Sequence, residues 1–340
     1  MRIGIDARFL GPEGTGIGRY VENLIKNLEI VDEENQYFIF LRSSNYHLYQ
    51  PKAPNFEKVK ADAKWYSLKE QLILPAVLNR EKLDLVHFPH FNIPLLYRGK
   101  FVVTIHDLTK SLFGDRASST RSLPIFLAKQ NAYKITINQA MARSKKILVP
   151  SEFVKKELVK SFDLTNEKIR VTYEGAEEFY DPKFVVSEGK TRELFNKYSL
   201  SEPYIIFVGN TFPYKNVDVI LEALTKLPTE LKFVCVSPRN RFLEKLIASA
   251  GHLGIKNRLT TPGYLSDSDL KVLFKKAVAF VFPSLSEGFG LPGLEAMGVG
   301  CPVISSDKTS LPEVYGEAAL YFKPDSSKEL VGKIEQIMKD

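Results

Sequence analysis

The stretch AVAFVFPSLSEGFGLPGLEAM (277–297) decides the fold of the second half of the chain. Its first eight residues read as a buried strand, and its last four as the opening of a helix. Between them, Gly288, Gly290 and Pro292 predict a tight turn in which backbone amides can approach a ligand closely. A strand, a glycine-rich turn and a helix N-terminus favour an anion site, because N–H groups and the helix dipole face the incoming charge.

Two glutamates bracket this turn, Glu287 before it and Glu295 inside the helix. Acids at such a place would repel a bare phosphate. They suit a ligand that carries hydroxyls beside its phosphates, because a carboxylate offers two oxygens to a vicinal diol. The pattern therefore favours a nucleotide-sugar, and the alternative is a strand–helix turn with two surface acids.

Short apolar, β-rich runs alternate with helical segments along the chain, which predicts parallel sheets covered by helices. We expect strands at 2–8, 37–42, 83–88, 101–107, 146–151 and 169–175, and then at 204–209, 231–237, 277–284 and 302–307. The intervening stretch 177–195 shows no sheet period and reads as the connection between two domains, 1–180 and 181–340. A length of 340 residues suits two such domains. The last segment, 326–340, reads as a helix.

The composition is that of a globular protein, with 44% hydrophobic residues. The first residues are strand-like rather than a signal peptide, and no apolar run is long enough to span a bilayer. Cys235 and Cys301 read as small buried residues of a reduced, cytoplasmic protein, without metal-ligand spacing.

The net charge of +7 is concentrated in segment 110–146, where eight lysines and arginines stand against Asp115. The segment is also rich in apolar residues, so it predicts contact with an anionic membrane surface or an anionic acceptor. A solvated helix with a buried apolar face is the alternative. Nucleic acid is not expected as a partner, because no nucleic-acid-binding motif accompanies the charge.

SEGFGLPGLEAMGVGCPVISSD (286–307), followed by SLPEVYGEAALYFKPDS (310–326), resembles the signature of the retaining glycosyltransferases of family 4. In that family two glutamates stand eight positions apart, as Glu287 and Glu295 do. The resemblance extends over nearly the whole chain through GIDARFL (4–10), GTGIGRY (14–20), VVTIHDL (102–108) and VPSEFVKKEL (149–158). It implies the GT-B fold: two doubly wound, Rossmann-like α/β domains facing across a cleft. Residues 1–180 would form the acceptor-side domain and residues 181–340 the nucleotide-sugar-binding domain.

The same resemblance gives roles to individual residues. Among the catalytic candidates, Lys215 is expected to contact the diphosphate, Glu287 the hexose hydroxyls, and His106 the donor sugar and the acceptor hydroxyl. Glu295 is expected to accept hydrogen bonds from the ribose. The other donor-binding candidates are Gly16, Ile17, Gly209, Asn210, Gly263, Tyr264, Leu265, Phe289, Gly290 and Leu291. Of these, 16–17 and 289–291 would offer amides to phosphate, and 263–265 would lie near the base.

The chain departs from the family pattern in the loop that holds Lys215. The family often carries an arginine in this loop, either beside the glycine or just before the lysine. This chain has Asn210 and Tyr214 at those two positions. The loss of this cation leaves either weaker binding of the diphosphate or a replacement cation from elsewhere, for example Arg19 or Arg8. No pair of aspartates of the D-x-D kind stands in a plausible metal loop, so no metal or other cofactor is expected.

These observations lead to one main hypothesis and two alternatives. The chain is expected to be a cytoplasmic, metal-independent hexosyltransferase, peripheral at the inner membrane face. It would transfer mannose with retention from GDP-mannose to a glycan or lipid-linked acceptor in cell-surface polysaccharide synthesis. The first alternative is a catalytically degenerate transferase that acts as a nucleotide- or glycan-binding scaffold. The second, an NAD-dependent oxidoreductase, is disfavoured because GTGIGRY has Arg19 where the dinucleotide fingerprint needs glycine.

Overall fold

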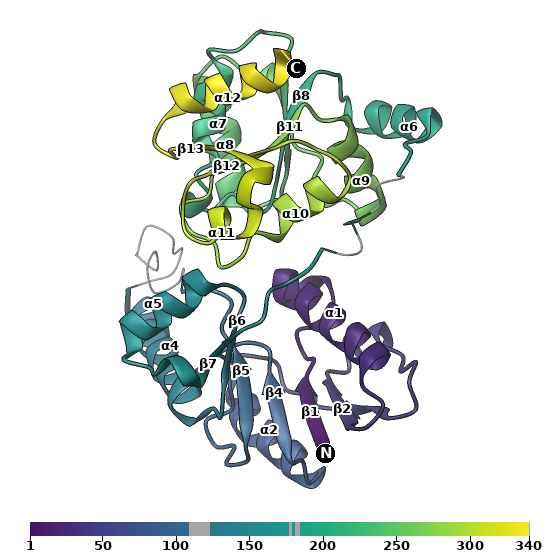
Figure 1. Ribbon diagram of the computed structural model, residues 1–340, viewed down its shortest axis with the longest axis vertical. Coiled ribbons are helices and arrows are strands. Elements are labelled where there is room, and N and C mark those ends of the chain that lie inside the picture. Colours follow the sequence, from purple (N-terminus) through teal and green to yellow (C-terminus); the bar gives the residue numbers. More distant parts are fainter. Residues whose placement is uncertain (109–122, 177–178, 181–183, 340) are drawn as a thin grey trace. The chain divides into compact units, whose positions relative to one another are not determined.

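A computed structural model describes residues 1–108, 123–176, 179–180 and 184–339 (Figure 1). The chain divides into two compact units. Within the described residues, unit 1 contains 1–108 and 123–172, and unit 2 contains the residues from Tyr173 onward. The division lies a little before the boundary expected at residue 180. We describe each unit by itself.

Unit 1 is built on a parallel sheet of seven strands in the order β3-β2-β1-β4-β5-β6-β7. Their bounds are β1 Arg2–Asp6, β2 Gln36–Leu41, β3 Phe56–Lys60, β4 Leu85–Phe88, β5 Phe101–Thr104, β6 Ile147–Val149 and β7 Ile169–Val171. The four helices that the described residues of this unit contain are α1 Thr15–Val31, α2 Leu68–Arg80, α4 Leu123–Arg143 and α5 Glu152–Phe162.

The apolar sequence of β2 shows why this sheet is buried on both faces. Tyr37, Ile39 and Leu41 pack in one hydrophobic cluster with residues of α1, whereas Phe38 and Phe40 pack in another with residues of α2, α4 and α5. Successive side chains of a strand point to opposite faces, so a continuous apolar run is typical of a sheet covered on both sides.

Unit 2 is built on a parallel sheet of six strands in the order β10-β9-β8-β11-β12-β13. Their bounds are β8 Tyr204–Val208, β9 Lys232–Val236, β10 Leu259–Thr260, β11 Ala279–Phe282, β12 Val303–Ser306 and β13 Ala319–Phe322. The helices are α6 Glu188–Tyr198, α7 Asp218–Leu224, α8 Arg241–His252, α9 Asp267–Lys276, α10 Leu291–Gly298, α11 Leu311–Tyr315 and α12 Ser327–Lys339. A single hydrophobic cluster, which includes Cys235 and Cys301, forms the core.

All ten expected strands and the terminal helix are present, which confirms the α/β fold. The strands that the sequence reading missed are β3, β10 and β13, and each lies at an edge of its sheet. The stretch that read as a connection, 177–195, overlaps helix α6, Glu188–Tyr198. An ion pair of 3.1 Å between Lys190 and Asp269 links α6 to α9. In the part of the chain that the structure describes, we find no helix with the length and apolar character needed to cross a membrane.

The strand order of each unit fixes where a ligand should bind. The order of the strands reverses between β1 and β4 in unit 1, and between β8 and β11 in unit 2. In open α/β sheets, ligands bind at such a switch point, outside the carboxyl ends of the strands. The relevant loops are therefore those that follow these four strands.

Candidate functional site

Lys215 and Glu287 lie together at the switch point of unit 2. Lys215 ends a short 3-10 turn, Pro213–Lys215, in the loop after β8, and Glu287 lies in the loop after β11. Lys215 Nζ is 2.5 Å from Glu287 Oε1, and the two side chains are 15% and 13% exposed. The Leu285 amide also donates to the Tyr214 carbonyl at 2.8 Å, which joins the two loops. The structure thus brings together a cation and a carboxylate that the sequence separates by 72 positions.

The turn after Glu287 has the glycine geometry that the sequence predicts. Helix α10 begins at Leu291, earlier than expected, and its N-cap Gly290 has φ of 107°. A β-carbon at Gly290 would lie 2.6 Å from the hydroxyl of Tyr315. Both the positive φ and the lack of space therefore require glycine here.

Three side chains from the region before and within α11 hold this turn. Ser310 Oγ donates to the carbonyl of Glu287 at 3.0 Å and to that of Phe289 at 3.3 Å. Tyr315 Oη donates to the carbonyl of Gly290 at 2.5 Å. Thr309 Oγ1 accepts from the Glu287 amide at 3.0 Å. We call Ser310 and Tyr315 the carbonyl clamp.

The carbonyl clamp also orients the amides of the turn. In a planar trans peptide, the carbonyl of one residue and the N–H of the next point in opposite directions. Because the carbonyls of Phe289 and Gly290 face the clamp, the N–H groups of Gly290 and Leu291 face away from it. An N–H at the start of a helix has no partner within the helix. Two of the three predicted phosphate-binding amides are therefore fixed in a common orientation, while the clamp does not determine that of Phe289.

The clamp tyrosine and the second glutamate are both buried. Burial, and then the carboxylate of Glu287, raise the pKa of Tyr315 well above its ordinary value, so its hydroxyl stays protonated and remains a donor. Glu295 lies within α10 and is 5% exposed. Ser310 and Tyr315 lie in the stretch 310–326 that carries the family resemblance, but no local pattern assigned a role to them or to Thr309, because their contacts are tertiary.

The other candidates of unit 2 follow β8 and β10. Gly209 has φ of 142°, and its amide donates to the Val236 carbonyl at 3.0 Å. Gly263 has φ of 85° and Tyr264 is 76% exposed. Leu265, in contrast, packs its side chain in the core, so only its backbone is available to a ligand.

Asn210 and Ser266 lie next to these candidates in the chain. Asn210 is partly buried in the loop after β8. Ser266 is the N-cap of α9, and its side chain accepts from the Asp269 amide at 3.2 Å.

His106 of unit 1 lies two residues beyond the end of β5. Its Nε2 is 2.9 Å from the carbonyl oxygen of Pro89, and its ring contacts the edge of Tyr20 at 4.7 Å between centroids. His106 is therefore held against the loop that follows β4, which is one of the two loops at the switch point of unit 1.

Gly16 and Ile17 lie in the first turn of α1 rather than in a loop. A β-carbon at Gly14 would lie 1.8 Å from the Phe9 carbonyl oxygen, and one at Gly18 would lie 2.4 Å from the Gly11 carbonyl oxygen. Packing explains those two glycines. Gly16 has open space beside it, so packing within the chain does not require a glycine at this position.

The expectation that Arg8 supplies a replacement cation is wrong. Its guanidinium is fully buried and forms ion pairs with Asp6 at 2.7 Å and with Glu70 at 2.6 Å. Burial alone would lower the pKa of Arg8, but these two carboxylates raise it above its ordinary value. Arg19, the other candidate, lies on α1 and is partly exposed.

Two further expectations concern metals and the basic segment. Among the described residues, no group of three or more His, Cys, Asp or Glu side chains is arranged to hold a metal ion. Of the basic segment 110–146, residues 110–122 lie outside the described residues, and the rest includes α4.

Comparisons with known proteins show the family of the chain. Residues 14–178 match the model of "Glycosyltransferase Family 4", and residues 190–340 match that of "Glycosyl transferases group 1". O-antigen chain mannosyltransferase B of Escherichia coli is 28% identical, over 96% of this chain and 87% of its own length. O-antigen chain mannosyltransferase RfbU of Salmonella typhimurium is also 28% identical, over 80% of this chain and 70% of its own length.

Solved structures show the same fold. The structure of HepE from Anabaena in complex with UDP and glucose covers all of this chain and 90% of its own, with a TM-score of 0.74 and 17% identity. WaaG, a glycosyltransferase involved in lipopolysaccharide biosynthesis, gives a TM-score of 0.73 at 14% identity, over all of this chain and 91% of its own. The chain belongs to the glycosyltransferases of family 4 and group 1, and it has the GT-B fold.

Proposed function

We propose that this glycosyltransferase moves a mannosyl group from GDP-mannose to a glycan or lipid-linked acceptor in cell-surface polysaccharide synthesis, with retention of configuration. The observation that carries the proposal is the Lys215–Glu287 pair beside the oriented amides of the glycine turn. Cation, amides and carboxylate together suit a diphosphate that bears hydroxylated sugars. The names of the two O-antigen relatives, both mannosyltransferases, support mannose as the sugar.

In this proposal the residues of unit 2 bind the donor. Lys215 and the amides of Phe289, Gly290 and Leu291 bind the diphosphate. Glu287 accepts from the hexose hydroxyls. The remaining donor contacts are Glu295 to the ribose, Gly263, Tyr264 and the Leu265 backbone to the base, and Gly209 and Asn210 in the phosphate loop.

The residues proposed from unit 1 are His106, Gly16 and Ile17. His106 contacts the donor sugar and positions the acceptor hydroxyl. The first-turn amides of Gly16 and Ile17 bind the diphosphate, and the open space at Gly16 supports a close approach of ligand to backbone.

The reaction breaks the bond between the anomeric carbon and the β-phosphate oxygen and forms a bond from that carbon to the acceptor oxygen. We propose front-face transfer, in which the departing phosphate oxygen takes the proton of the acceptor hydroxyl. Negative charge grows on the β-phosphate as the bond breaks, so a cation and preoriented amides there lower the barrier. The proposal assigns this stabilisation to Lys215 and the turn amides, without a metal ion.

We also propose a cytoplasmic location, with peripheral contact of the 110–146 segment with the anionic inner face of the membrane. Within its described part, α4 exposes Leu127 and Ile135 beside Lys129 and Lys134, and buries Ile137. Exposed apolar and basic side chains on one helix support binding to such a surface.

The donor can be identified by thermal unfolding of the purified protein with saturating GDP, UDP, ADP or NAD, each with and without magnesium. A ligand at about 100 times its Kd should stabilise the protein by about 2.7 kcal/mol. We expect a shift with GDP that magnesium does not change and that Glu295→Ala abolishes. A shift with UDP alone would refute GDP-mannose as donor, and no shift with any nucleotide would favour the scaffold alternative.

A second measurement tests the transfer reaction and its stereochemistry. Turnover of the sugar nucleotide, monitored by release of the nucleoside diphosphate, should disappear in Glu287→Ala. Analysis of the product anomer by NMR tests retention. An inverted product, or a glycosyl group trapped covalently on Glu287, would refute front-face transfer.

A further inference from the structure

Six aromatic rings gather at the carboxyl edge of the sheet in unit 1. They follow β1, β3 and β4, apart from Tyr133 of α4, and we call them the aromatic cluster: Phe9, Trp65, Tyr66, His90, Phe91 and Tyr133. Phe9 stacks on Trp65 at 4.6 Å between centroids, and Tyr66 meets His90 edge-on at 6.2 Å. Phe9, His90 and Phe91 are buried, whereas Tyr66 is 56% exposed.

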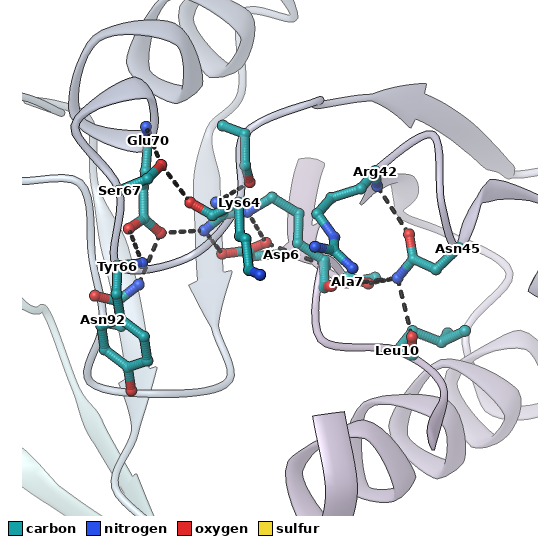
Figure 2. Close-up of polar contacts among 12 residues, drawn as sticks. Asp6, Ala7, Leu10, Arg42, Asn45, Lys64, Tyr66, Ser67, Glu70 and Asn92 are labelled. Atoms are coloured by element: carbon teal, nitrogen blue, oxygen red, sulfur yellow. Dashed lines mark hydrogen bonds and ion pairs between the residues drawn. The ribbon is translucent and has the colours of Figure 1, made fainter. Parts of the chain in front are cut away.

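The backbone of Tyr66 is in a conformation that aromatic residues rarely adopt, with φ of 60°. The amide of Tyr66 donates to Oε2 of Glu70 at 2.8 Å. The other oxygen of Glu70 accepts from Arg8 Nη2 at 2.6 Å and from Asn92 Nδ2 at 2.7 Å, and Figure 2 shows this carboxylate among its partners. Arg8 is in turn bound by Asp6.

The ionic network that holds the Tyr66 amide costs free energy. Arg8 and Glu70 are fully buried, and burying charges is unfavourable unless their geometry and hydrogen bonds are complete. Strained backbone that the surrounding structure enforces occurs preferentially at ligand sites. A buried ionic network that ends at a strained residue with an exposed ring therefore indicates a binding role for that ring.

The position of the cluster agrees with such a role. Asp6 ends β1 and His90 lies two residues after β4, so the network and the cluster lie at the switch point between these strands. The carbonyl of Pro89, next to His90 in the chain, is the group that contacts His106 Nε2. The cluster is therefore continuous with the candidate catalytic residue of unit 1.

The charges around the cluster indicate which ligand it suits. Arg8 is neutralised by its two acids, and Arg42, which lies over the Trp65 ring at 4.3 Å, pairs with Glu13. Both guanidinium groups are thus balanced by carboxylates of this chain. An exposed aromatic ring beside balanced charges suits an uncharged ligand with an apolar face. A pyranose ring has such a face, lined by C–H groups, and a rim of hydroxyls.

We propose that Tyr66, with Trp65 beside it in the chain, forms an acceptor subsite in which the exposed Tyr66 ring binds a neutral pyranose residue of the glycan acceptor by stacking. This inference rests on the proposed function for the identity of the acceptor. Tyr66 is the contact residue, and Glu70 and Arg8 are positioning residues that hold its backbone.

Trp65 is the single tryptophan of the chain, so its fluorescence reports directly on this subsite. The titrant is an α-linked mannobiose, which does not absorb in the tryptophan band. We expect a saturable fluorescence change in the wild type. The Kd for mannobiose should rise about tenfold or more in Tyr66→Ala, because truncation of an aromatic contact residue typically weakens binding by this much. It should change little in Tyr66→Phe, which keeps the ring. Tyr180→Ala, which removes another exposed tyrosine, should leave it unchanged.

Enzyme kinetics provide the second readout. Tyr66→Ala should raise the KM for the mannobiose acceptor about tenfold or more, whereas Tyr66→Phe should change it little. The proposal is overturned if no saturable fluorescence change occurs in the wild type, if Tyr66→Ala binds mannobiose as tightly as the wild type, or if Tyr66→Phe is as weak as Tyr66→Ala. Mannobiose binding without turnover of any sugar nucleotide would refute the proposed function and leave the subsite supported.

Discussion

Replacement of Tyr315 by phenylalanine tests whether the carbonyl clamp prepares the turn for a diphosphate. The substitution removes one hydroxyl and keeps the ring that fills the space beside Gly290 and Gly293. It deletes the hydrogen bond of 2.5 Å to the Gly290 carbonyl, while Ser310 still holds the Phe289 carbonyl. The peptide that carries the Leu291 amide then keeps only the hydrogen bond of 3.2 Å that its carbonyl accepts from the Gly293 amide, so its orientation is less firmly fixed.

The magnitude follows from one buried hydrogen bond. Such a bond contributes about 1 kcal/mol net. If the ligand must reorder the peptide when it binds, about 1 kcal/mol is lost from binding, which is about a fivefold rise in Kd. Because Tyr315 is 3% exposed, we also expect a lower midpoint of thermal unfolding for the free protein.

Isothermal titration with GDP and with guanosine separates the two effects. A role in orienting the amide predicts weaker binding of GDP and unchanged binding of guanosine, since only GDP carries the diphosphate. Tyr321→Phe is a matched control, because Tyr321 Oη donates to the Gly316 carbonyl at 2.7 Å at an exposed place in the same unit. Equal losses for GDP and guanosine, or an unchanged Kd for GDP, would refute the reasoning.

Three further outcomes follow from the structure. Lys215→Met should lower kcat by about a hundredfold, because the cation beside the leaving group is lost, and initial rates within twofold of the wild type would contradict this role. Burial, and then the charge of His106, lower the pKa of His87 to about 4. Between about pH 6.5 and pH 4 the unfolded state therefore binds more protons than the folded state. The free energy of unfolding should fall by about 3 kcal/mol as the pH drops through this range. Denaturant unfolding at the two pH values should show this slope in the wild type and a smaller one in His87→Asn, and equal slopes would count against it. Arg8→Met should lower the free energy of unfolding by about 3–5 kcal/mol, because it leaves two buried acids without their cation. The fluorescence of the single tryptophan reports this for unit 1, and Arg80→Met, at a surface ion pair, should change it by less than about 1 kcal/mol.

The edge strands show where the sequence reading of the fold reached its limit. The central strands are continuous apolar runs because both their faces are buried. β3 has the sequence FEKVK, with exposed charged residues between buried ones, and β10 has only two residues. Strands with a neighbour on one side need less burial and can be shorter, so their apolar signal is weak. The fold class was therefore predictable, whereas the full extent of each sheet was not.

The candidate site shows a similar division. Glycines and acids near one another in sequence predicted a turn at Gly290, and the structure has its positive φ. The contact between Lys215 and Glu287 and the contact between Tyr315 and Gly290 join residues 72 and 25 positions apart. No local pattern specifies such contacts. Arg8 is the opposite case, because its sequence position suggested an available cation and its tertiary partners neutralise it.

The proposed donor site and the proposed acceptor subsite are both held by side chains that do not contact the ligand. In unit 2, Tyr315 binds the carbonyl of Gly290 and thereby orients a backbone amide. In unit 1, Glu70, held by Arg8, binds the amide of Tyr66 and thereby orients an aromatic ring. In both cases a buried side chain from elsewhere in the chain fixes a segment of backbone with positive φ before any ligand binds. Such preorganisation lowers the entropy lost on binding, so substitutions at the supporting residues should weaken ligand affinity even though these residues touch no ligand.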